Sequence, residues 1–374
     1  MVSRVGAAVR ITLAVSQLTK LGGKERDCLA TARHLAERGH QVTVLTTAVA
    51  DDLAAAPFRL ELLRVRGFSN HSRSAAFARA VVKSHRQQGG DLLFAFDRMP
   101  GADVFFAADR SYLRRYHGLA AKLLPRRRTM LALERGVYQP PAATKLFFLT
   151  AQQRDEYQQF YGFDPARGSV LPMILHDERF AALEGAAERG AVRRELGIPD
   201  DATLVLGIGI AARLKGFDRT LAAVAAQPNL HLLLAGSSDR WLAPQVAELG
   251  LQDRVRLLPY VPNVMDLLLA ADLFVHPARE EAGGIVIGEA LLAGLPVIVS
   301  AVCGYAPVVA RSGAGIVLPE PFTPEALSAA LIEVTGALPA FRERASAEAA
   351  NLRETRGAWL RCIAEQVEAA AATR

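Results

Sequence analysis

Short apolar runs alternate with segments of helical periodicity along the first half of the chain. The runs have the length of buried strands, whereas the segments between them repeat their apolar positions every three to four residues. Strands are predicted at 9–15, 41–47, 91–96, 102–109 and 144–150, and a helix at 28–39, where Gly39 supplies the stop. Strands that alternate with helices in this way are typical of a doubly wound parallel sheet, so we expect one α/β lobe over residues 1–172.

The same pattern starts again after a segment that we interpret as a linker, residues 171–190. Strands are predicted at 203–210, 230–236, 254–260, 271–278 and 296–302, with helices at 218–227, 242–250 and 285–294 and just before 271. The tail, 347–373, has a mainly helical pattern. We therefore predict a second Rossmann-like α/β lobe over 173–355 and a C-terminal helix, 356–374, that packs back towards the first lobe.

Two lobes agree with the length of the chain, since 374 residues exceed one ordinary core at a prior of roughly 150 residues per domain. In open α/β sheets, ligands bind beyond the carboxyl ends of the strands, at the point where the strand order reverses. We therefore expect two facing lobes with a cleft for two ligands, and we expect the chemistry to cluster at strand ends.

Composition narrows the choice of protein class. With 51% hydrophobic and 22% charged residues, the chain is neither disordered nor fibrous, and its net charge of +6 favours anionic ligands: nucleotide diphosphates, nucleic acid or an anionic membrane surface. Cys28, Cys303 and Cys362 lie too far apart for a zinc site. Arg4 and Arg10 interrupt the apolar N-terminus, and no run reaches the roughly 20 apolar residues of a membrane span, so we expect a cytoplasmic protein, at most peripheral to a membrane.

The loop LGGKERD carries the first candidate residues. Gly22 and Gly23 lie between a strand and a helix, where missing Cβ atoms let backbone amides approach a phosphate or a sugar, although a plain tight turn gives the same pattern. Asp27 is predicted in the first helical turn, either opposite the helix dipole or directed at a substrate hydroxyl. Asp109 closes an apolar strand and is either a reacting group at the sheet edge or a solvated turn residue.

The second lobe carries a cationic loop and a pair of carboxylates. Arg213 and Lys215 follow a strand in a glycine-containing loop and are suited to a leaving diphosphate, or else belong to an ordinary charged surface. Glu281 and Glu289 lie eight residues apart, and Gly283 and Gly284 open the helix that carries Glu289. Amides at a helix start bind diphosphates, and carboxylates accept hydrogen bonds from the paired hydroxyls of ribose and sugar. Because its neighbours are almost all apolar, we do not interpret Glu289 as a plain surface acid.

Two histidines and a basic segment are less informative. His176 and His276 have no recognisable partner at a motif spacing, so we interpret both as structural, and no Ser/His/Asp or P-loop pattern occurs. The segment 110–138 contains many basic residues and one acid, Glu134, interleaved with tyrosines and leucines. It is typical of an interfacial helix on anionic lipid, of a site for a phosphorylated acceptor, or of a solvated charged helix.

Taken together, LGGKERD, AARLKG, HPAREEAGGIVIGEALLAGLPVI and the helical tail resemble glycosyltransferase family 4, the retaining enzymes with the two-lobed GT-B fold, over nearly the whole chain. Within that family, the chain is most similar to the enzymes that add glucose to an inner-core heptose of lipopolysaccharide. Three stretches carry this similarity: RMPGADVFFAAD, HPAREEAGGIVIGEALLAGLPVIVSAVCGYA and LPEPF.

The resemblance implies a UDP-glucose donor and a lipopolysaccharide acceptor, with no resident cofactor and no metal. It places Glu289 on the ribose, Glu281 near the donor sugar and Lys215 with Arg213 at the diphosphate. The glycines Gly22, Gly23, Gly283 and Gly284, together with Ile285, would also lie beside the donor, and Asp27 and Asp109 would act in the active site. Arg179 matches an arginine of the family.

Two departures from the family pattern stand out: Leu214 replaces a cation that often precedes the lysine, and PMIL replaces a PPGI-like hinge ahead of Arg179. Cations and helix amides would replace the divalent metal that other sugar-transferring folds use. The alternatives are another family activity with galactose, N-acetylglucosamine or mannose, and a non-catalytic basic nucleotide- or nucleic-acid-binding protein. Few aromatic residues and no recognisable module argue against nucleic acid as a partner.

Overall fold

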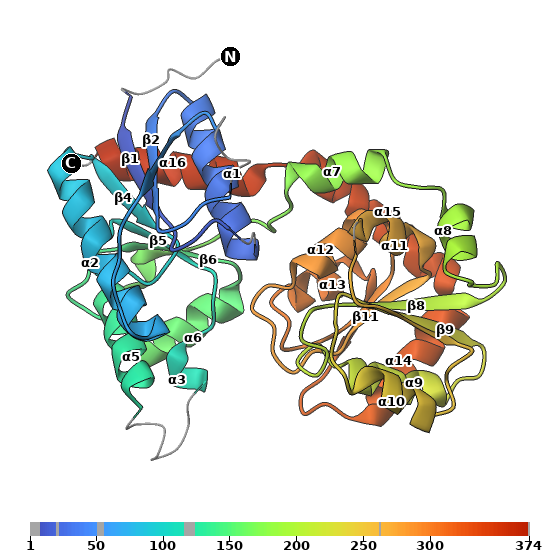
Figure 1. Ribbon diagram of the computed structural model, residues 1–374. Helices are drawn as coiled ribbons and strands as arrows, with labels where there is room; N and C mark the ends of the chain where they lie inside the picture. Colours follow the sequence, from blue (N-terminus) through green and yellow to red (C-terminus); the bar gives the residue numbers. More distant parts are fainter. Residues whose placement is uncertain (1–7, 20–21, 51–55, 116–123, 262, 373–374) are drawn as a thin grey trace. The chain divides into compact units, whose positions relative to one another are not determined.

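The computed structural model describes residues 8–19, 22–50, 56–115, 124–261 and 263–372 (Figure 1). The chain divides into two compact units, the first formed by residues 1–172 and 358–374 and the second by residues 173–357.

A seven-stranded parallel sheet forms the centre of the first unit, in the order β3-β2-β1-β4-β5-β6-β7. Its strands are β1 Arg10–Ala14, β2 Gln41–Thr46, β3 Arg59–Leu62, β4 Leu92–Ala95, β5 Val104–Ala107, β6 Lys145–Phe148 and β7 Gly168–Val170. Its helices are α1 Gly23–Glu37, α2 Asn70–Gln88, α3 Tyr112–Arg115, α5 Pro125–Tyr138, α6 Ala151–Tyr161 and α16 Ala358–Ala372, with a 3₁₀ turn at Pro165–Arg167.

The second unit contains a six-stranded parallel sheet in the order β10-β9-β8-β11-β12-β13. The strands are β8 Thr203–Ile208, β9 Leu230–Ala235, β10 Val255–Leu258, β11 Leu273–His276, β12 Val297–Ser300 and β13 Gly315–Leu318. The helices are α7 Asp177–Glu184, α8 Arg189–Glu195, α9 Phe217–Ala225, α10 Leu242–Glu248, α11 Val264–Ala270, α12 Ile285–Leu292, α13 Ala306–Ser312, α14 Pro324–Gly336 and α15 Leu338–Glu354.

Central strands of both sheets are buried along their whole length, as β4, β5, β11 and β12 show. Helices that cover both faces of a parallel sheet cause this burial and explain the continuous apolar runs in the sequence. All predicted strands lie where the runs place them, whereas β3, β7 and β13 were not predicted. These three lie at sheet edges and are partly exposed, so their apolar pattern is weak.

The interpretation of 171–190 as a linker is wrong, because α7 lies inside this range and α8 begins there. Phe180 on α7 is buried in the core of the second unit, and Asp266 accepts a hydrogen bond from the Ala187 amide. The helical tail is interrupted between α15 and α16, where Gly357 adopts a positive φ of 71°. From that glycine the chain returns to the first unit, where α16 packs against α1.

Each strand order has one reversal that fixes where a ligand site is expected. The reversal lies between β1 and β4 in the first sheet and between β8 and β11 in the second. At such a point the neighbouring loops leave in opposite directions and open a crevice at the carboxyl ends of the strands.

Candidate donor and acceptor sites

In the second unit, the loops after β8 and β11 bring together two predicted site residues, Lys215 and Glu281, and a histidine that we interpreted as structural, His276. Lys215 follows β8, His276 ends β11, and Glu281 follows five residues later. The Lys215 Nζ lies 2.6 Å from Oε2 of Glu281, and Nε2 of His276 lies 3.0 Å from the same oxygen. The cluster therefore lies at the strand-order reversal, where the fold predicts a ligand.

His276 has a partner that its spacing in the sequence did not reveal. Its side chain is completely buried, and its Nε2 contacts Glu281. A five-residue separation across the end of a strand corresponds to no helical or strand period, so the spacing gave no signal. The position of His276 at the end of a predicted apolar strand could have indicated a site residue.

The carboxyl group of Glu281 has a strongly shifted pKa. Burial raises the pKa, but the hydrogen bond with His276 and the charge of Lys215 outweigh burial and lower it to about 2. Glu281 is therefore a carboxylate at neutral pH and can accept hydrogen bonds but cannot donate a proton.

Close contacts of the backbone fix the two loops against each other. Gly216, with φ of 75°, begins α9, and a Cβ atom there would lie 2.1 Å from the carbonyl oxygen of Pro277. Arg279 donates hydrogen bonds to both carboxylate oxygens of Asp218 and to the carbonyl oxygen of Arg213. Lys215 and Glu281 are thus held at a fixed separation by the surrounding chain.

Helix α12 begins at the predicted glycine pair. Gly284 is its N-cap with φ of 88°, and a Cβ atom there would lie 2.7 Å from Cδ1 of Ile287 and 3.2 Å from Cγ of Glu281. The carbonyl oxygen of Gly283 accepts a hydrogen bond from the Tyr305 amide at 3.0 Å. The first helical turn starts at Ile285, and the Ile287 amide donates to the carbonyl oxygen of Gly284 at 2.8 Å. The amides that a helix start leaves without a partner inside the helix are suited to an anion.

Glu289 lies one turn into α12, is buried, and is paired with a residue from the segment interpreted as a linker. Nε of Arg179, on α7, lies 2.6 Å from Oε1 of Glu289. The family resemblance implies that both residues lie beside the donor, and the structure brings them into contact.

Arg213 differs from Lys215 in its surroundings. Its side chain is 64% exposed, and its guanidinium lies 4.4 Å from the ring centroid of Trp241. An exposed cation that stacks on an aromatic ring is positioned and remains accessible to an anion.

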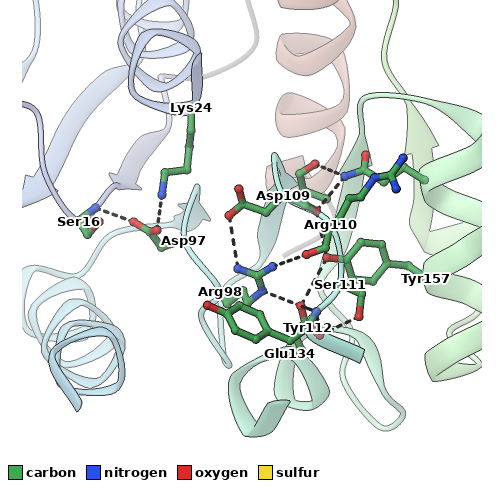
Figure 2. A network of polar contacts seen from close by, with 12 residues as sticks. Ser16, Lys24, Asp97, Arg98, Asp109, Arg110, Ser111, Tyr112, Glu134 and Tyr157 are labelled. Carbon is green, nitrogen blue, oxygen red and sulfur yellow. Dashed lines mark hydrogen bonds and ion pairs between the residues drawn. The ribbon is translucent and has the colours of Figure 1, made fainter. Parts of the chain in front are cut away.

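In the first unit, the described residues of LGGKERD are Gly22 and the start of α1, and they follow β1 at the carboxyl edge of the sheet. Gly22, the N-cap of α1, and Gly23 are exposed. Nζ of Lys24 lies 2.5 Å from Oδ1 of Asp97, which follows β4, while the Ser16 amide donates to the other carboxylate oxygen at 2.6 Å (Figure 2). Neither Lys24 nor Asp97 was predicted as a site residue, although both follow predicted elements of this edge.

The prediction that Asp27 lies in the first helical turn is wrong. Because α1 begins at Gly23, Asp27 falls in the second turn, and it is buried. The helix-dipole interpretation thereby loses its basis, since the dipole acts mainly at the first turn; Glu25 is the acid found there.

Asp109 lies beyond β5 with a side chain that is 62% exposed. Its Oδ2 is 3.4 Å from Nη1 of Arg98, and its carbonyl oxygen accepts a hydrogen bond from the Tyr157 hydroxyl at 3.1 Å (Figure 2). Burial lowers the pKa of Lys24, but the nearby carboxylates of Asp97 and Asp109 outweigh burial and raise it. Asp109 therefore lies near the Lys24–Asp97 pair at one sheet edge.

Behind Asp109 lies a buried polar cluster around Glu134, which the sequence showed only as the single acid of a basic segment. Glu134 has no exposed surface, and Nε of Arg98 lies 2.8 Å from its Oε1. The Tyr112 amide and the Tyr161 hydroxyl also donate to it. Figure 2 shows Arg98 between Glu134 and Asp109.

The described part of the basic segment 110–138 is partly buried. In its described part, α3 and α5, Leu131, Leu133, Val137 and Tyr138 are buried in the core, while Arg126, Arg128 and Arg135 are exposed. Tyr116, Leu119, Lys122 and Leu123 lie outside the described residues. No helix in the described part of the chain is long and apolar enough to cross a membrane.

Two doubly wound units, each built on a parallel sheet with polar residues at the carboxyl edge of its strand-order reversal, form the architecture of the GT-B class of glycosyltransferases, and a crystal structure of such an enzyme superposes on this chain. Residues 188–351 match the family model "Glycosyl transferases group 1", and residues 21–179 match "Glycosyltransferase Family 4".

Known proteins extend this match to nearly the full chain. The lipopolysaccharide glucosyltransferase WaaG of Escherichia coli K12 is 35% identical over 319 residues, which cover 83% of this chain and 85% of WaaG. The D-inositol 3-phosphate glycosyltransferase of Geodermatophilus obscurus is 30% identical over 352 residues, covering 83% of this chain and 77% of the relative. A crystal structure of WaaG superposes with a TM-score of 0.83 at 30% identity, covering 96% of this chain and 99% of that structure. The chain belongs to glycosyltransferase family 4, and the predicted fold class and the prediction of a glycosyltransferase are confirmed.

Proposed function

We propose that this glycosyltransferase moves glucose from UDP-glucose to an inner-core heptose of lipopolysaccharide, with retention of configuration. The observation that carries the proposal is the pair of ion-paired carboxylates, Lys215–Glu281 and Arg179–Glu289, at the donor edge of the second sheet. The name of WaaG, a relative at 35% identity, supports glucose and lipopolysaccharide as the substrates. Relatives named for an inositol phosphate acceptor keep other acceptors and donor sugars as the alternative.

In this proposal the second unit binds the donor. Glu289, held by Arg179, accepts hydrogen bonds from the ribose hydroxyls, and Glu281 accepts hydrogen bonds from the transferred sugar. The diphosphate is bound by Lys215, by Arg213 and by the backbone at Gly283, Gly284 and Ile285. For Gly22 and Gly23 in the first unit, whose residues are exposed, we propose backbone contacts with the donor.

Transfer then needs no enzymic nucleophile. A diphosphate oxygen accepts the proton of the acceptor hydroxyl as the C1–O bond to the diphosphate breaks and the new glycosidic bond forms on the same face. Lys215 and the amides of α12 stabilise the charge that develops on the leaving diphosphate, as a metal does in other folds. Asp27 and Asp109 are proposed to act on the acceptor side, where Asp109 is the accessible carboxylate.

A donor screen tests the proposal. Heptose-terminated lipopolysaccharide is incubated with UDP-glucose, UDP-galactose, UDP-N-acetylglucosamine or GDP-mannose, and nucleotide release and sugar transfer are measured. UDP-glucose should give the highest kcat/KM, and the activity should survive EDTA. If UDP-glucose neither binds nor turns over, the glucose assignment fails, and a strict metal requirement contradicts the proposed mechanism.

Two variants separate the roles of the donor residues. Glu289→Gln should raise KM for UDP-glucose about 10- to 100-fold, because it removes charged hydrogen bonds to the ribose. Lys215→Met should lower kcat about 100-fold or more, because charge develops on the diphosphate in the transition state. Arg10→Ala, which breaks the exposed Arg10–Asp91 pair, is the matched control and should leave both constants unchanged.

We further propose that the enzyme works at the cytoplasmic face of the inner membrane and that segment 110–138 binds its anionic surface. The exposed arginines of α5 support this placement. Sedimentation with liposomes should show binding that requires anionic lipid and weakens with salt. Equal binding to neutral vesicles would refute the electrostatic part.

A further inference from the structure

A groove of about 920 Å³ lies between α2 and α5 of the first unit. The two helices pack against each other (Figure 1). The apolar residues that line the groove are Ala75, Ala78, Val82, Pro100, Ala132 and Leu133. Its volume lies in the range of pockets that enclose a small organic ligand, roughly 300–1,000 Å³.

Small side chains keep this groove open. Both helices present alanines to it, Ala75 and Ala78 from α2 and Ala132 from α5. Gly136 lets α5 approach the loop after β4, since a Cβ atom there would lie 2.5 Å from Cγ of Pro100. The apolar lining is therefore a feature of helix packing and leaves room for an apolar chain.

Three cations from α2 also line the groove: Arg79, Lys83 and Arg86. Their spacing of i, i+4 and i+7 puts them on one face of the helix. All three are exposed, and no ion pair is recorded for them within the described residues. Helix α2 contains no acid, and the single acid of α5, Glu134, is buried against Arg98.

Exposed apolar residues lie at the start of both helices. Phe68, two residues before α2, is fully exposed, and Leu124, the N-cap of α5, is 46% exposed. Along the chain, Phe68 lies four residues before Ser72 and Leu124 lies five residues before Thr129, and both Ser72 and Thr129 line the groove.

We propose that this α2–α5 groove binds one acyl chain of an anionic phospholipid, with the phosphate on Arg79, Lys83 and Arg86. A free anion would use the cations without the apolar lining, and a neutral lipid would use the lining without the cations. Long basic side chains can lie along an apolar surface while their charged ends contact a headgroup. The site differs from adsorption of segment 110–138 to a charged surface, because its cations come from α2, and it does not depend on the identity of the sugar substrates.

Calorimetric titration of the full chain with single-chain probes below their micelle-forming concentration tests the proposal. Octyl phosphate should bind about 15-fold more tightly than hexyl phosphate, since each buried methylene contributes about 0.8 kcal/mol. Inorganic phosphate and the uncharged octyl glucoside should each bind at least about 10-fold more weakly than octyl phosphate. If phosphate alone binds as tightly as octyl phosphate, or chain length has no effect, the acyl-chain site is refuted.

Two variant pairs locate the site. Ala132→Phe fills the groove from an exposed position of α5, whereas Ala350→Phe makes the same change at an exposed position of α15 in the other unit. Arg79→Glu with Lys83→Glu reverses the groove charge, and Arg194→Glu with Arg311→Glu makes the same change in net charge on the second unit. The groove variants should bind octyl phosphate at least about 10-fold more weakly, and the controls should match the unaltered protein.

Thermal unfolding shows whether each variant is folded, so that lost binding is not confused with lost structure. If Ala132→Phe does not fold, the charge-reversal pair still decides the outcome. Unchanged binding of octyl phosphate by a folded groove variant overturns the proposal.

Discussion

Glu281 is a carboxylate over the whole neutral range because its pKa is lowered to about 2 by His276 and Lys215, against the effect of burial. A group in this state serves as a fixed negative charge and hydrogen-bond acceptor. Its protonation therefore contributes nothing to a pH optimum near neutrality, which must come from other groups.

The same shift predicts how stability depends on pH. The pKa of Glu281 is lower in the folded protein than its ordinary 4.5, so its stabilisation is fully present above pH 4.5 and is lost as pH falls towards 2. The shift corresponds to roughly 3 kcal/mol of unfolding free energy. Between pH 7 and pH 3, the second unit of Glu281→Gln should therefore lose less stability than that of the unaltered protein. Unfolding followed in each unit at both pH values measures this, with the first unit as the internal control; equal losses would contradict it.

Arg98 carries a second residue-scale prediction, because it joins the buried Glu134 to the exposed Asp109. Arg98→Ala leaves Glu134 buried without its cation, which should lower the unfolding free energy by about 3–5 kcal/mol. Arg10→Ala, in an exposed ion pair, should cost less than about 1 kcal/mol. Chemical denaturation of both variants measures their unfolding free energies. Similar losses in the two variants would show that the buried Arg98–Glu134 pair stabilises the protein no more than an exposed pair.

At the scale of elements, the start of α9 is fixed by a contact that only glycine permits. Gly216→Ala combines a strained positive φ with a Cβ atom 2.1 Å from the Pro277 carbonyl oxygen, so the loops after β8 and β11 must separate. Gly250 has a similar φ of 67°, but a Cβ atom there would have no neighbour within 4 Å. The substitution Gly250→Ala therefore measures the cost of the positive φ alone, roughly 1 kcal/mol.

We expect Gly216→Ala to lose clearly more stability than Gly250→Ala and to weaken UDP-glucose binding, because Lys215 moves away from Glu281. Thermal unfolding and donor titration measure the two effects. Equal losses of unfolding free energy in the two variants would show that the loops after β8 and β11 move apart without destabilising the protein.

At the scale of the whole molecule, the first unit is built from both ends of the chain. Helix α16 packs against α1, buries Trp359 and Ile363, and places Glu368 against Arg38, with Nε of Arg38 2.7 Å from Oε1. Trp359→Ala should destabilise the first unit by about 3–5 kcal/mol and leave the second unit unchanged. Glu368→Gln, which breaks only a partly exposed pair, should cost less than about 1 kcal/mol. Hydrogen exchange resolves the two units, and an equal loss of protection in both would contradict independent cores.

The sequence by itself determined the class of fold and pointed to most of the residues that we propose for the donor site. Fully buried strands need continuous apolar runs, and helices need apolar residues on one face, so local patterns reveal both. Because ligand groups follow strand ends, Lys215 and Glu281 could be found from their places after predicted strands. Glu289 was found from apolar neighbours that make a solvated glutamate improbable.

Only the tertiary structure decided which residues meet. Glu134 lies 36 positions from Arg98, and Arg179 lies 110 positions from Glu289, so their pairing depends on strand order and helix packing. The contact of His276 with Glu281 depends on how the chain turns after β11, which no periodicity describes. Burial of the partners at these contacts, and hence the low pKa of Glu281, follows from the packed sheet and helices and cannot be read from any single segment.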